Sequence, residues 1–218
     1  FGFGFAIRAP IVPFHGWFAD LAEQAPTSLL VLVSSVFIKT ASYAFMRVNY
    51  SLLVHASAWM SHGLSVMAAA TIVYGALCAL GQWDLRRMFA FSCLSHVGLV
   101  ILGLSVFNDT AFQGALLQMS SHAVYGALFV FLIGFLGLRT STFQYGQTDG
   151  VTEVSKDSSF GLASKLPIFA ALFALAVFSI LGIPGLAGFN SNVLILLGVF
   201  QQHRILTVFA LAGMLITV

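Results

Sequence analysis

Long apolar stretches with few charges dominate the pattern of residues along the chain. A spanning helix needs about 20 mostly apolar residues, and backbone groups in hydrocarbon must hydrogen-bond within their own segment. Five stretches are long enough to span, namely 27–49, 52–80, 88–107, 111–138 and 166–200, and two shorter ones lie at the ends of the sequence, 1–18 and 205–218. The pattern predicts an all-α integral membrane protein built as a multi-helix transmembrane bundle.

Two of these stretches are interrupted by proline and glycine. The first reads AIRAPIVPFHGW, with Pro10 and Pro13 beside Arg8. The second reads SILGIPGLAGFNS and places Pro184 near the centre of residues 166–200. Such a break is tolerated where protein buries it or where it lines a water-filled cavity. A proline kink is the alternative for either break alone, but the pair favours two discontinuous helices of the kind that mark an ion pathway.

The composition agrees with lipid as the main solvent. Charged residues make up 7% of the 218 residues, against about 25% in an ordinary soluble domain. Hydrophobic residues make up 59%, and the mean hydropathy is +0.98. These values exclude a soluble globule, which needs a polar surface, and a disordered chain, which is poor in apolar residues. The net charge of +2 gives no indication of nucleic acid as a partner.

The distribution of basic residues predicts an orientation in the membrane. Loops 81–87 and 139–165 share one side and carry five basic residues, whereas the other side has Arg47 and Arg204 near helix ends. Basic residues are enriched in cytoplasmic loops. We therefore expect residues 139–165 to form a polar loop in the cytoplasm or an equivalent compartment, such as a mitochondrial matrix.

Lys39 is predicted to lie near the middle of the bilayer. It is 12 residues from Thr27 and 8 from Arg47. A charge at that depth costs about 3 kcal/mol on insertion scales, and the amine would have to climb about 12 Å to reach the interface. Burial favours the neutral amine, which lets a lysine exchange protons. The position favours a proton-carrying Lys39 over a structural one, whereas Arg47 fits snorkelling to the interface.

His96 and His122 form a second polar group. Each lies 13 residues from Asp109 in the predicted turn between their helices, so an antiparallel hairpin places both at one depth, roughly 20 Å from the turn. An imidazole can take a proton on one nitrogen and release one from the other. A lone membrane histidine is more often a hydrogen-bond partner, but the matched pair favours a relay. Hydroxyls that would extend the relay, or bond their own helix backbone, belong to Ser95, Ser120 and Ser121.

The remaining histidines and cysteines do not indicate a metal or cofactor site. No metal-ligating residue lies three or four positions after any histidine, and HExxH, phosphate-binding glycine loops and nucleophile–base pairs are absent from the sequence. His55 and His62 are expected at the membrane interface. Cys78 and Cys93 lack redox-like spacing and are interpreted as packing residues. We expect no cofactor and no metal on this chain.

Several long blocks resemble the antiporter-like membrane subunits of respiratory complex I, of the chain 4 type of NADH:quinone oxidoreductase. IRAPIVPFHGWFADLAEQAPTS followed by IKTASYAFMR is similar to the hallmark of that family. The blocks DLRRMFAFSCLSHVGLV, GALLQMSSHAVYGALFVFLIG and GIPGLAGFNSNVLILLG agree in order and spacing. The resemblance implies a 14-helix bundle with two inverted five-helix repeats, each with a broken helix. Residues 1–218 would then be a single transmembrane domain, a fragment that covers helix 7 to the start of helix 13.

The resemblance also implies roles for particular residues. Lys39 would be the central lysine of helix 8, and His96 and His122 would be the bridging histidines of helices 10 and 11. Arg8 stands where the family has the lysine of helix 7, and Asn192 where it has the glutamate of helix 12. Arginine holds its proton, although its fixed charge can tune a neighbour, and asparagine does not titrate. The usual proton outlet would therefore be rerouted or lost.

The function implied by the resemblance is proton translocation. The chain would be a membrane-arm subunit of proton-translocating NADH:quinone oxidoreductase, without redox chemistry of its own. Electron transfer elsewhere in the complex would move protons through Lys39, His122 and His96. One alternative is a structural antiporter-like subunit that has lost transport, which Arg8 and Asn192 favour. The other is a subunit of a cation/proton antiporter or membrane-bound hydrogenase, which the SCLSH and LQMSSH blocks fit less well.

Partners and location follow from the same resemblance. The expected partners are other membrane-arm subunits of complex I and the lipid bilayer, and a separate polypeptide that supplies the N-terminal helices is a further candidate. Phenylalanine accounts for 22 of 218 residues, a bias common in AT-rich organellar genomes. That abundance favours a multi-pass protein of the mitochondrial inner membrane over the bacterial plasma membrane or the thylakoid.

Overall fold

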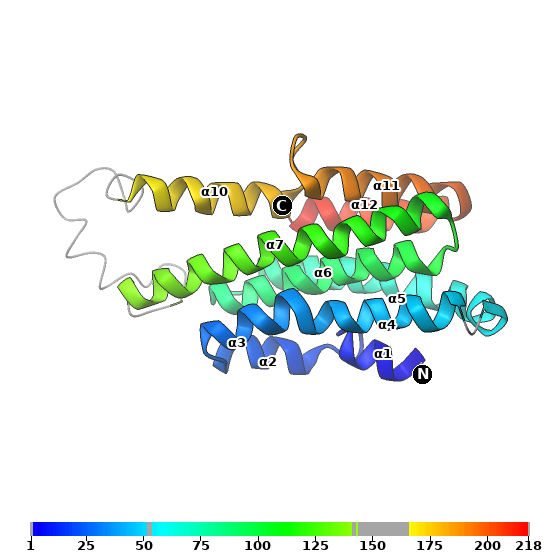
Figure 1. The fold of residues 1–218 in the computed structure, drawn as a ribbon, viewed down its shortest axis with the longest axis horizontal. Helices are drawn as coiled ribbons and strands as arrows, with labels where there is room; N and C mark the ends of the chain where they lie inside the picture. Colours follow the sequence, from blue (N-terminus) through cyan, green and yellow to red (C-terminus); the bar gives the residue numbers. More distant parts are fainter. Residues whose placement is uncertain (1, 52–53, 141–142, 144–165, 218) are drawn as a thin grey trace.

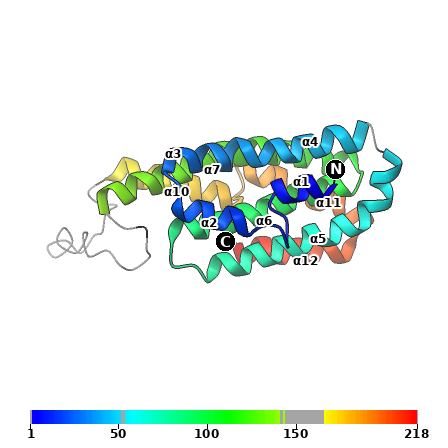
Figure 2. The same ribbon diagram turned by 90° about the horizontal axis from the view of Figure 1, so that it is seen from below.

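The molecule is a bundle of helices that run along one long axis (Figures 1 and 2). The structure is a computed structural model, and it describes residues 2–51, 54–140, 143 and 166–217. Its helices are α1 (Gly2–Arg8), α2 (Gly16–Gln24), α3 (Thr27–Leu32), the π-helix η1 (Val33–Phe37), α4 (Ile38–Ser51), α5 (Val54–Leu80), α6 (Leu85–Ser105), α7 (Asp109–Thr140), α10 (Pro167–Leu181), α11 (Ala187–Gln202) and α12 (Arg204–Thr217). These described ranges contain no strand. The predicted all-α membrane fold is confirmed.

Four segments are long and apolar enough to cross a bilayer as continuous helices. They are Thr27–Val48, Trp59–Leu80, Leu85–Ser105 and Asp109–Leu138. They correspond to four of the five predicted spanning stretches. The fifth, residues 166–200, is divided into α10 and α11, as its proline and glycine residues predicted.

Helix α6 forms the centre of the bundle. Every residue from Phe89 to Ser105 is buried apart from Ser92, with α5 and α7 packed on its two sides. The helices approach closely where glycine replaces a side chain. A Cβ at Gly75 of α5 would lie 2.9 Å from the carbonyl oxygen of Phe91, and one at Gly114 of α7 would lie 2.7 Å from the backbone nitrogen of Ile195 in α11. The polar residues of these helices are therefore held close together.

The first predicted interruption separates α1 from α2. Pro10 and Pro13 occupy this segment, and a side chain from another helix satisfies part of its backbone. The Val12 N–H donates to Thr71 Oγ1 of α5 at 3.2 Å. The indole N–H of Trp17 donates to the Ile7 carbonyl at the end of α1, at 2.9 Å. Protein contacts thus supply the hydrogen bonds that a broken helix loses in a membrane.

The second interruption separates α10 from α11. Gly182 ends α10 in the left-handed conformation with φ of 69°. The N–H groups of Gly182 and Ile183 donate to the carbonyls of Ser179 and Phe178 at 3.3 and 3.1 Å, which is a Schellman motif. Both interruptions lie near the middle of the long axis, on opposite sides of the bundle (Figure 1). The prediction of two discontinuous helices is confirmed.

The end of α7 corrects one predicted boundary. Helix α7 extends to Thr140, so the first two residues of the predicted polar loop 139–165 are helical. Phe143 lies against the start of α6, where its carbonyl accepts the Leu85 N–H at 3.0 Å and its ring lies 3.6 Å from the Arg86 guanidinium carbon. Loop 81–87 and the end of α7 therefore share one side, as predicted. Residues 144–165, with most of the loop's charges, lie outside the described residues.

Asp84 caps the N-terminus of α6, and its removal tests the stability of this central helix. Its carboxylate accepts the N–H groups of Arg86 and Arg87 at 2.8 and 3.1 Å. We expect Asp84→Ala to lower the free energy of unfolding by about 1 kcal/mol, because two backbone donors lose their partner. Asp84→Asn should retain most of the stability. The thermal unfolding midpoint in detergent measures both changes, and equal losses would contradict the capping role.

Candidate functional site

Lys39 occupies the first turn of α4 and is buried. Its Nζ donates to the Ser34 carbonyl at 2.8 Å and lies 2.7 Å from Nδ1 of His122 on α7. These are hydrogen-bond distances at which a proton can pass between a donor and an acceptor. The structure thus places the predicted proton-carrying lysine in direct contact with one of the two predicted histidines.

A π-helical turn lies directly before the helix that carries Lys39. The sequence pattern predicts an even helix over 27–49, but Val33–Phe37 form a π-turn immediately before α4. The wider turn brings the Ser34 carbonyl within reach of the Lys39 amine, five residues further along the chain. Such turns occur mostly as single insertions in α-helices, frequently at functional sites. The apolar pattern carries no signal for it, so sequence reasoning missed both the turn and the role of Ser34.

His96 of α6 and His122 of α7 face each other in the buried centre. Their ring centroids lie 5.1 Å apart with a tilt of 59° between the planes. Tyr125 closes the group, with its ring 5.2 Å from His122 and 6.1 Å from His96. The equal depth predicted from Asp109 is therefore observed.

Gln118 connects this pair to the broken helix α11. Its Nε2 donates to Tyr125 Oη at 3.0 Å and lies 3.1 Å from Nδ1 of His96. Its Oε1 accepts the hydroxyl of Ser191. Sequence reasoning missed Gln118, Tyr125 and Ser191. The available signal was the position of Gln118, four residues before His122 on the same face of an otherwise apolar helix.

Asn192 lies beside His96 across a small cavity. The cavity measures about 10 Å³, is bounded by α6, α10, α11 and α12, and is lined by both Asn192 and His96. Among the described residues, Nε2 of His96 and Oδ1 of Asn192 are buried without a hydrogen-bond partner. A volume of roughly 10–15 Å³ holds one water molecule. Asn192 therefore lies next to His96, and its side-chain amide does not titrate as a carboxyl would.

Arg8 lies outside this cluster. It ends α1, and its guanidinium donates to Thr40 Oγ1 at 3.2 Å and lies 4.2 Å from the centroid of the Phe37 ring. Thr40 and Phe37 are exposed, whereas Lys39 is buried. The structure brings Lys39, His122 and His96 together with Asn192, and leaves Arg8 on the outer side of the helix that carries Lys39.

The predicted serine hydroxyls do not extend the relay. Ser120 and Ser121 donate to carbonyls of their own helix, at 2.9 Å to Leu117 and 3.4 Å to Gln118. This is the backbone-bonding alternative. Ser95 pairs instead with Thr217 of α12 at 3.3 Å, beside the cavity of Asn192.

No acidic side chain of the described segments lies beside Lys39. The acids of the described segments lie elsewhere, since Asp20 and Glu23 are near Arg87, Asp84 caps α6 and Asp109 begins α7. The ammonium of Lys39 therefore meets neutral dipoles and imidazoles. Within the same segments, no three histidine, cysteine or acidic side chains gather as metal ligands would.

The other candidate histidines and cysteines lie apart from the cluster. The rings of His62 and His203 are 5.5 Å apart, at the junction of α5 with α11 and α12. The side chain of His55 lies outside the described residues. Cys78 and Cys93 are both free thiols, and Cys93 is buried in the main core cluster, as its packing interpretation predicted.

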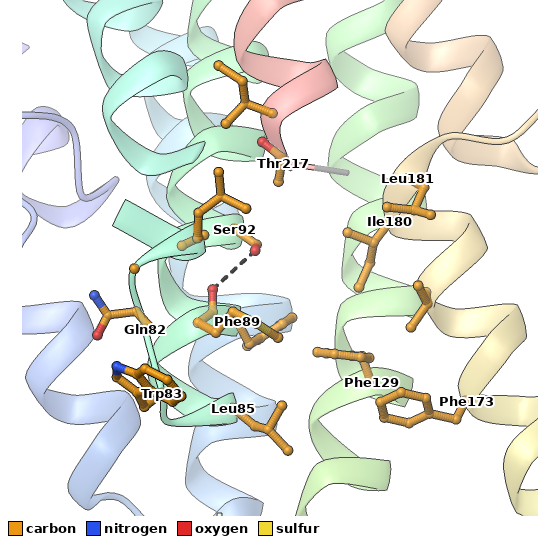
Figure 3. A pocket seen from close by; sticks show the side chains of 16 residues that line it. Gln82, Trp83, Leu85, Phe89, Ser92, Phe129, Phe173, Ile180, Leu181 and Thr217 are labelled. Carbon is orange, nitrogen blue, oxygen red and sulfur yellow. Dashed lines mark hydrogen bonds between the residues drawn. The ribbon is translucent and has the colours of Figure 1, made fainter. Parts of the chain in front are cut away.

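A larger apolar groove lies between α6 and α10 (Figure 3). It measures about 670 Å³. Phe89, Phe129 and Phe173 line it, with the α5–α6 turn at one end. It shares Ile180, Leu181 and Thr217 with the small cavity of Asn192. Its walls are mostly apolar, so the groove itself offers no chain of proton carriers.

The sequence of the chain is similar to those of membrane subunits of NADH:quinone oxidoreductases. The profile of the family described as NADH:quinone oxidoreductase/Mrp antiporter, TM, matches residues 1–217. NADH-quinone oxidoreductase subunit M of Rickettsia bellii is 35% identical over 212 residues, which cover 97% of this chain and 41% of that protein. The chloroplastic NAD(P)H-quinone oxidoreductase chain 4 of Cryptomeria japonica is 34% identical over 220 residues, covering 98% and 42%. The chain thus spans about two fifths of these relatives.

Solved structures share the fold. A chain of respiratory complex I from Thermus thermophilus superposes with a TM-score of 0.87 at 28% identity, covering 98% of this chain and 43% of that one. A chain of the Mrp complex from a Dietzia species also gives a TM-score of 0.87, at 25% identity, covering 99% and 38%. Both similarities extend over the two broken helices and the helices that carry Lys39, His96 and His122.

Proposed function

The chain belongs to the NADH:quinone oxidoreductase/Mrp antiporter transmembrane family, and from that membership we propose that it translocates protons in the membrane arm of a NADH:quinone oxidoreductase. Electron transfer takes place on other subunits of such a complex. This chain contributes proton transfer through its buried polar cluster, with Lys39 as the central carrier. The observation that carries the proposal is the 2.7 Å contact between Lys39 Nζ and His122 Nδ1.

The first step of the proposed path is proton transfer from lysine to histidine. The Lys39 ammonium gives a proton to Nδ1 of His122 and becomes a neutral amine that still donates to Ser34. Burial away from carboxylates penalises the Lys39 ammonium, and it penalises the His122 imidazolium as well, so a change in nearby charge or hydration has to drive this transfer. His122 then releases the proton on Nε2, as a histidine relay requires.

The second step joins the two histidines. A centroid separation of 5.1 Å is bridged by rotation of a ring or by one water molecule. At His96, one water in the cavity would accept from Nε2 and donate to Oδ1 of Asn192, which satisfies two buried atoms that lack protein partners. Asn192 would thus hold water on the route where the family has a carboxyl, which is the rerouted outlet.

A structural subunit without transport is the competing proposal. It is favoured by Asn192, which does not titrate, and by Arg8, whose guanidinium lies on the outer face of the Lys39 helix and keeps its proton. The direct pairing of Lys39 with His122 favours transport, because a buried ammonium without a carboxylate is costly for a purely structural role. A cation/proton antiporter or hydrogenase subunit shares the fold, and the relatives of subunit M and chain 4 type weigh against it.

We also propose the setting of the chain. Its partners are other membrane subunits of a multi-subunit complex, together with lipid. The rest of the 14-helix family fold, including its helix 5 glutamate, would come from further segments of the same polypeptide or from a separate one. The abundance of phenylalanine supports the mitochondrial inner membrane, while the relatives named above are bacterial and chloroplast proteins.

Proton pumping by the intact complex in sealed vesicles tests the proposed function. The number of protons moved per electron is measured for the wild type and for a complex with Lys39 substituted. Transport through this chain requires the number to fall while quinone reduction continues. An unchanged number in a fully assembled Lys39 variant would support the structural alternative.

Restoring a carboxyl at Asn192 tests the rerouted outlet. We expect Asn192→Glu to leave the number of protons per electron unchanged, because water bound by the amide already completes the route. Asn190→Glu, on the exposed face of the same helix, controls for the effect of an added charge. A clear rise in pumping that is specific to Asn192→Glu would show that the asparagine blocks the path.

A further inference from the structure

The side chain of Gln118 makes polar contacts with three other side chains. It is fully buried on α7, and it contacts His96 of α6, Tyr125 of its own helix and Ser191 of α11. Each polar atom of its amide has a partner, because Nε2 uses its two hydrogens on His96 and Tyr125 while Oε1 accepts from Ser191. A buried amide in this position connects the histidine pair to the broken helix.

The amide determines which nitrogen of neutral His96 carries the proton. Because Gln118 Nε2 donates to Nδ1 of His96, that nitrogen is an acceptor and holds no hydrogen. The proton of the neutral ring therefore lies on Nε2, which is buried without a protein partner, and His96 is one of the residues that line the cavity shared with Asn192. Gln118 thus sets the direction in which His96 presents its proton.

A second orientation of the amide fits the cationic ring. When His96 takes a proton on Nδ1, this N–H needs an acceptor, which Oε1 supplies after the amide turns by half a rotation. Tyr125 can then donate to the same oxygen. Nε2 of Gln118 would donate to Ser191 Oγ, whose hydrogen would turn to the Gly188 carbonyl at 2.9 Å. The Gln118 amide, Nδ1 of His96, the Tyr125 hydroxyl and Ser191 Oγ each keep a hydrogen-bond partner in both orientations, which limits the cost of the turn.

We propose that Gln118 is a positioning residue whose side-chain amide turns with the proton occupancy of His96 and transmits that occupancy to α11 through Ser191. This inference rests on the proposed proton path and assigns the control of one of its steps. The groups that face His96 are His122, Tyr125 and Gln118, with Lys39 behind His122. Gln118 is the member of this set that the structure places at hydrogen-bond distance from Nδ1, and its uncharged amide can either donate to that nitrogen or accept from it.

Two substitutions at Gln118 separate this role from packing. Gln118→Met keeps the length of the side chain but removes the hydrogen-bond donor and the acceptor of the amide. Pumping by the intact complex in vesicles should therefore fall to the level of the Lys39→Met complex. Gln118→Glu accepts but does not donate, which favours the cationic His96. Its pH profile of pumping should shift upwards by about one unit. A packing role predicts similar profiles for both variants. Gln113→Met, exposed on the same helix, is the matched control.

Ser191→Ala keeps the inference testable if Gln118→Met fails to assemble. Removing the hydroxyl takes a partner from both amide orientations, so a partial loss of pumping without a shift in the pH profile is expected. Wild-type pumping and profiles in Ser191→Ala and Gln118→Glu would overturn the role of Gln118. Wild-type pumping in Gln118→Met together with a defective Lys39→Met complex would overturn it and leave the proposed function intact. Wild-type pumping in Lys39→Met would overturn the proposed function itself.

Discussion

The Lys39→Met complex is expected to assemble and reduce quinone but to move no protons through this subunit. Methionine fills the space of the buried side chain without an ionisable group, so the contact with His122 Nδ1 at 2.7 Å is lost. A positioned acid or base contributes roughly 10²–10⁴-fold to a proton-transfer rate. Its removal therefore lowers the measured number of protons per electron, and coupled quinone reduction should also slow.

Two further variants determine what property of Lys39 matters. Lys39→Arg keeps a positive charge but holds its proton, so pumping should be lost as it is in Lys39→Met. Tyr43→Phe lies one turn further along α4 on an exposed face and should pump normally. Full pumping in Lys39→Arg would mean that a fixed charge suffices, and would contradict a role for Lys39 as a proton carrier.

The Lys39→Met/His122→Gln double variant is expected to pump no less than either single variant. If the two residues act in series on one path, interrupting either contact stops the same flow. Residues that act as a unit show strongly non-additive effects. Glutamine at position 122 retains a hydrogen-bonding group near Lys39 but cannot relay a proton, so the single variant should already lose most of the translocation.

A double-mutant cycle requires the number of protons per electron for the wild type, both single variants and the double variant, all measured in the same vesicles. Two contacting residues on one path should give a coupling free energy near the full effect of one substitution. Glutamine at position 113, which faces outward on α7, provides a distant pair with Lys39 that should show no coupling. Additive losses at Lys39 and His122 would indicate two separate routes.

Much of the fold is predictable from the sequence because membrane insertion imposes strong patterns. The lengths of the apolar stretches predict four continuous spans, and the proline and glycine residues predict the breaks between α1 and α2 and between α10 and α11. Counting residues from Asp109 also predicts that His96 and His122 share one depth, since both helices rise from the same turn at a fixed 1.5 Å per residue, to within about one turn.

The polar contacts of the site are less predictable because they depend on the rotation of helices about their axes. An apolar span has a weak pattern of faces, so the sequence does not indicate that Gln118 reaches His96 and Ser191 together. The π-turn before Lys39 has ordinary residues and no signature of its own. The resemblance assigns Arg8 to the path, whereas its contacts with Thr40 and Phe37 depend on the local geometry of α1.

Helix α7 has a mechanical consequence for the cluster. It is a single uninterrupted rod from Asp109 to Thr140. His122 and Gln118, one helical turn apart on one face, make the contacts to Lys39 on one side and to α11 on the other. A twist of this rod about its own axis would therefore disconnect both contacts at once. The contact of this cluster with Lys39 and its contact with α11 therefore both depend on the rotation of α7.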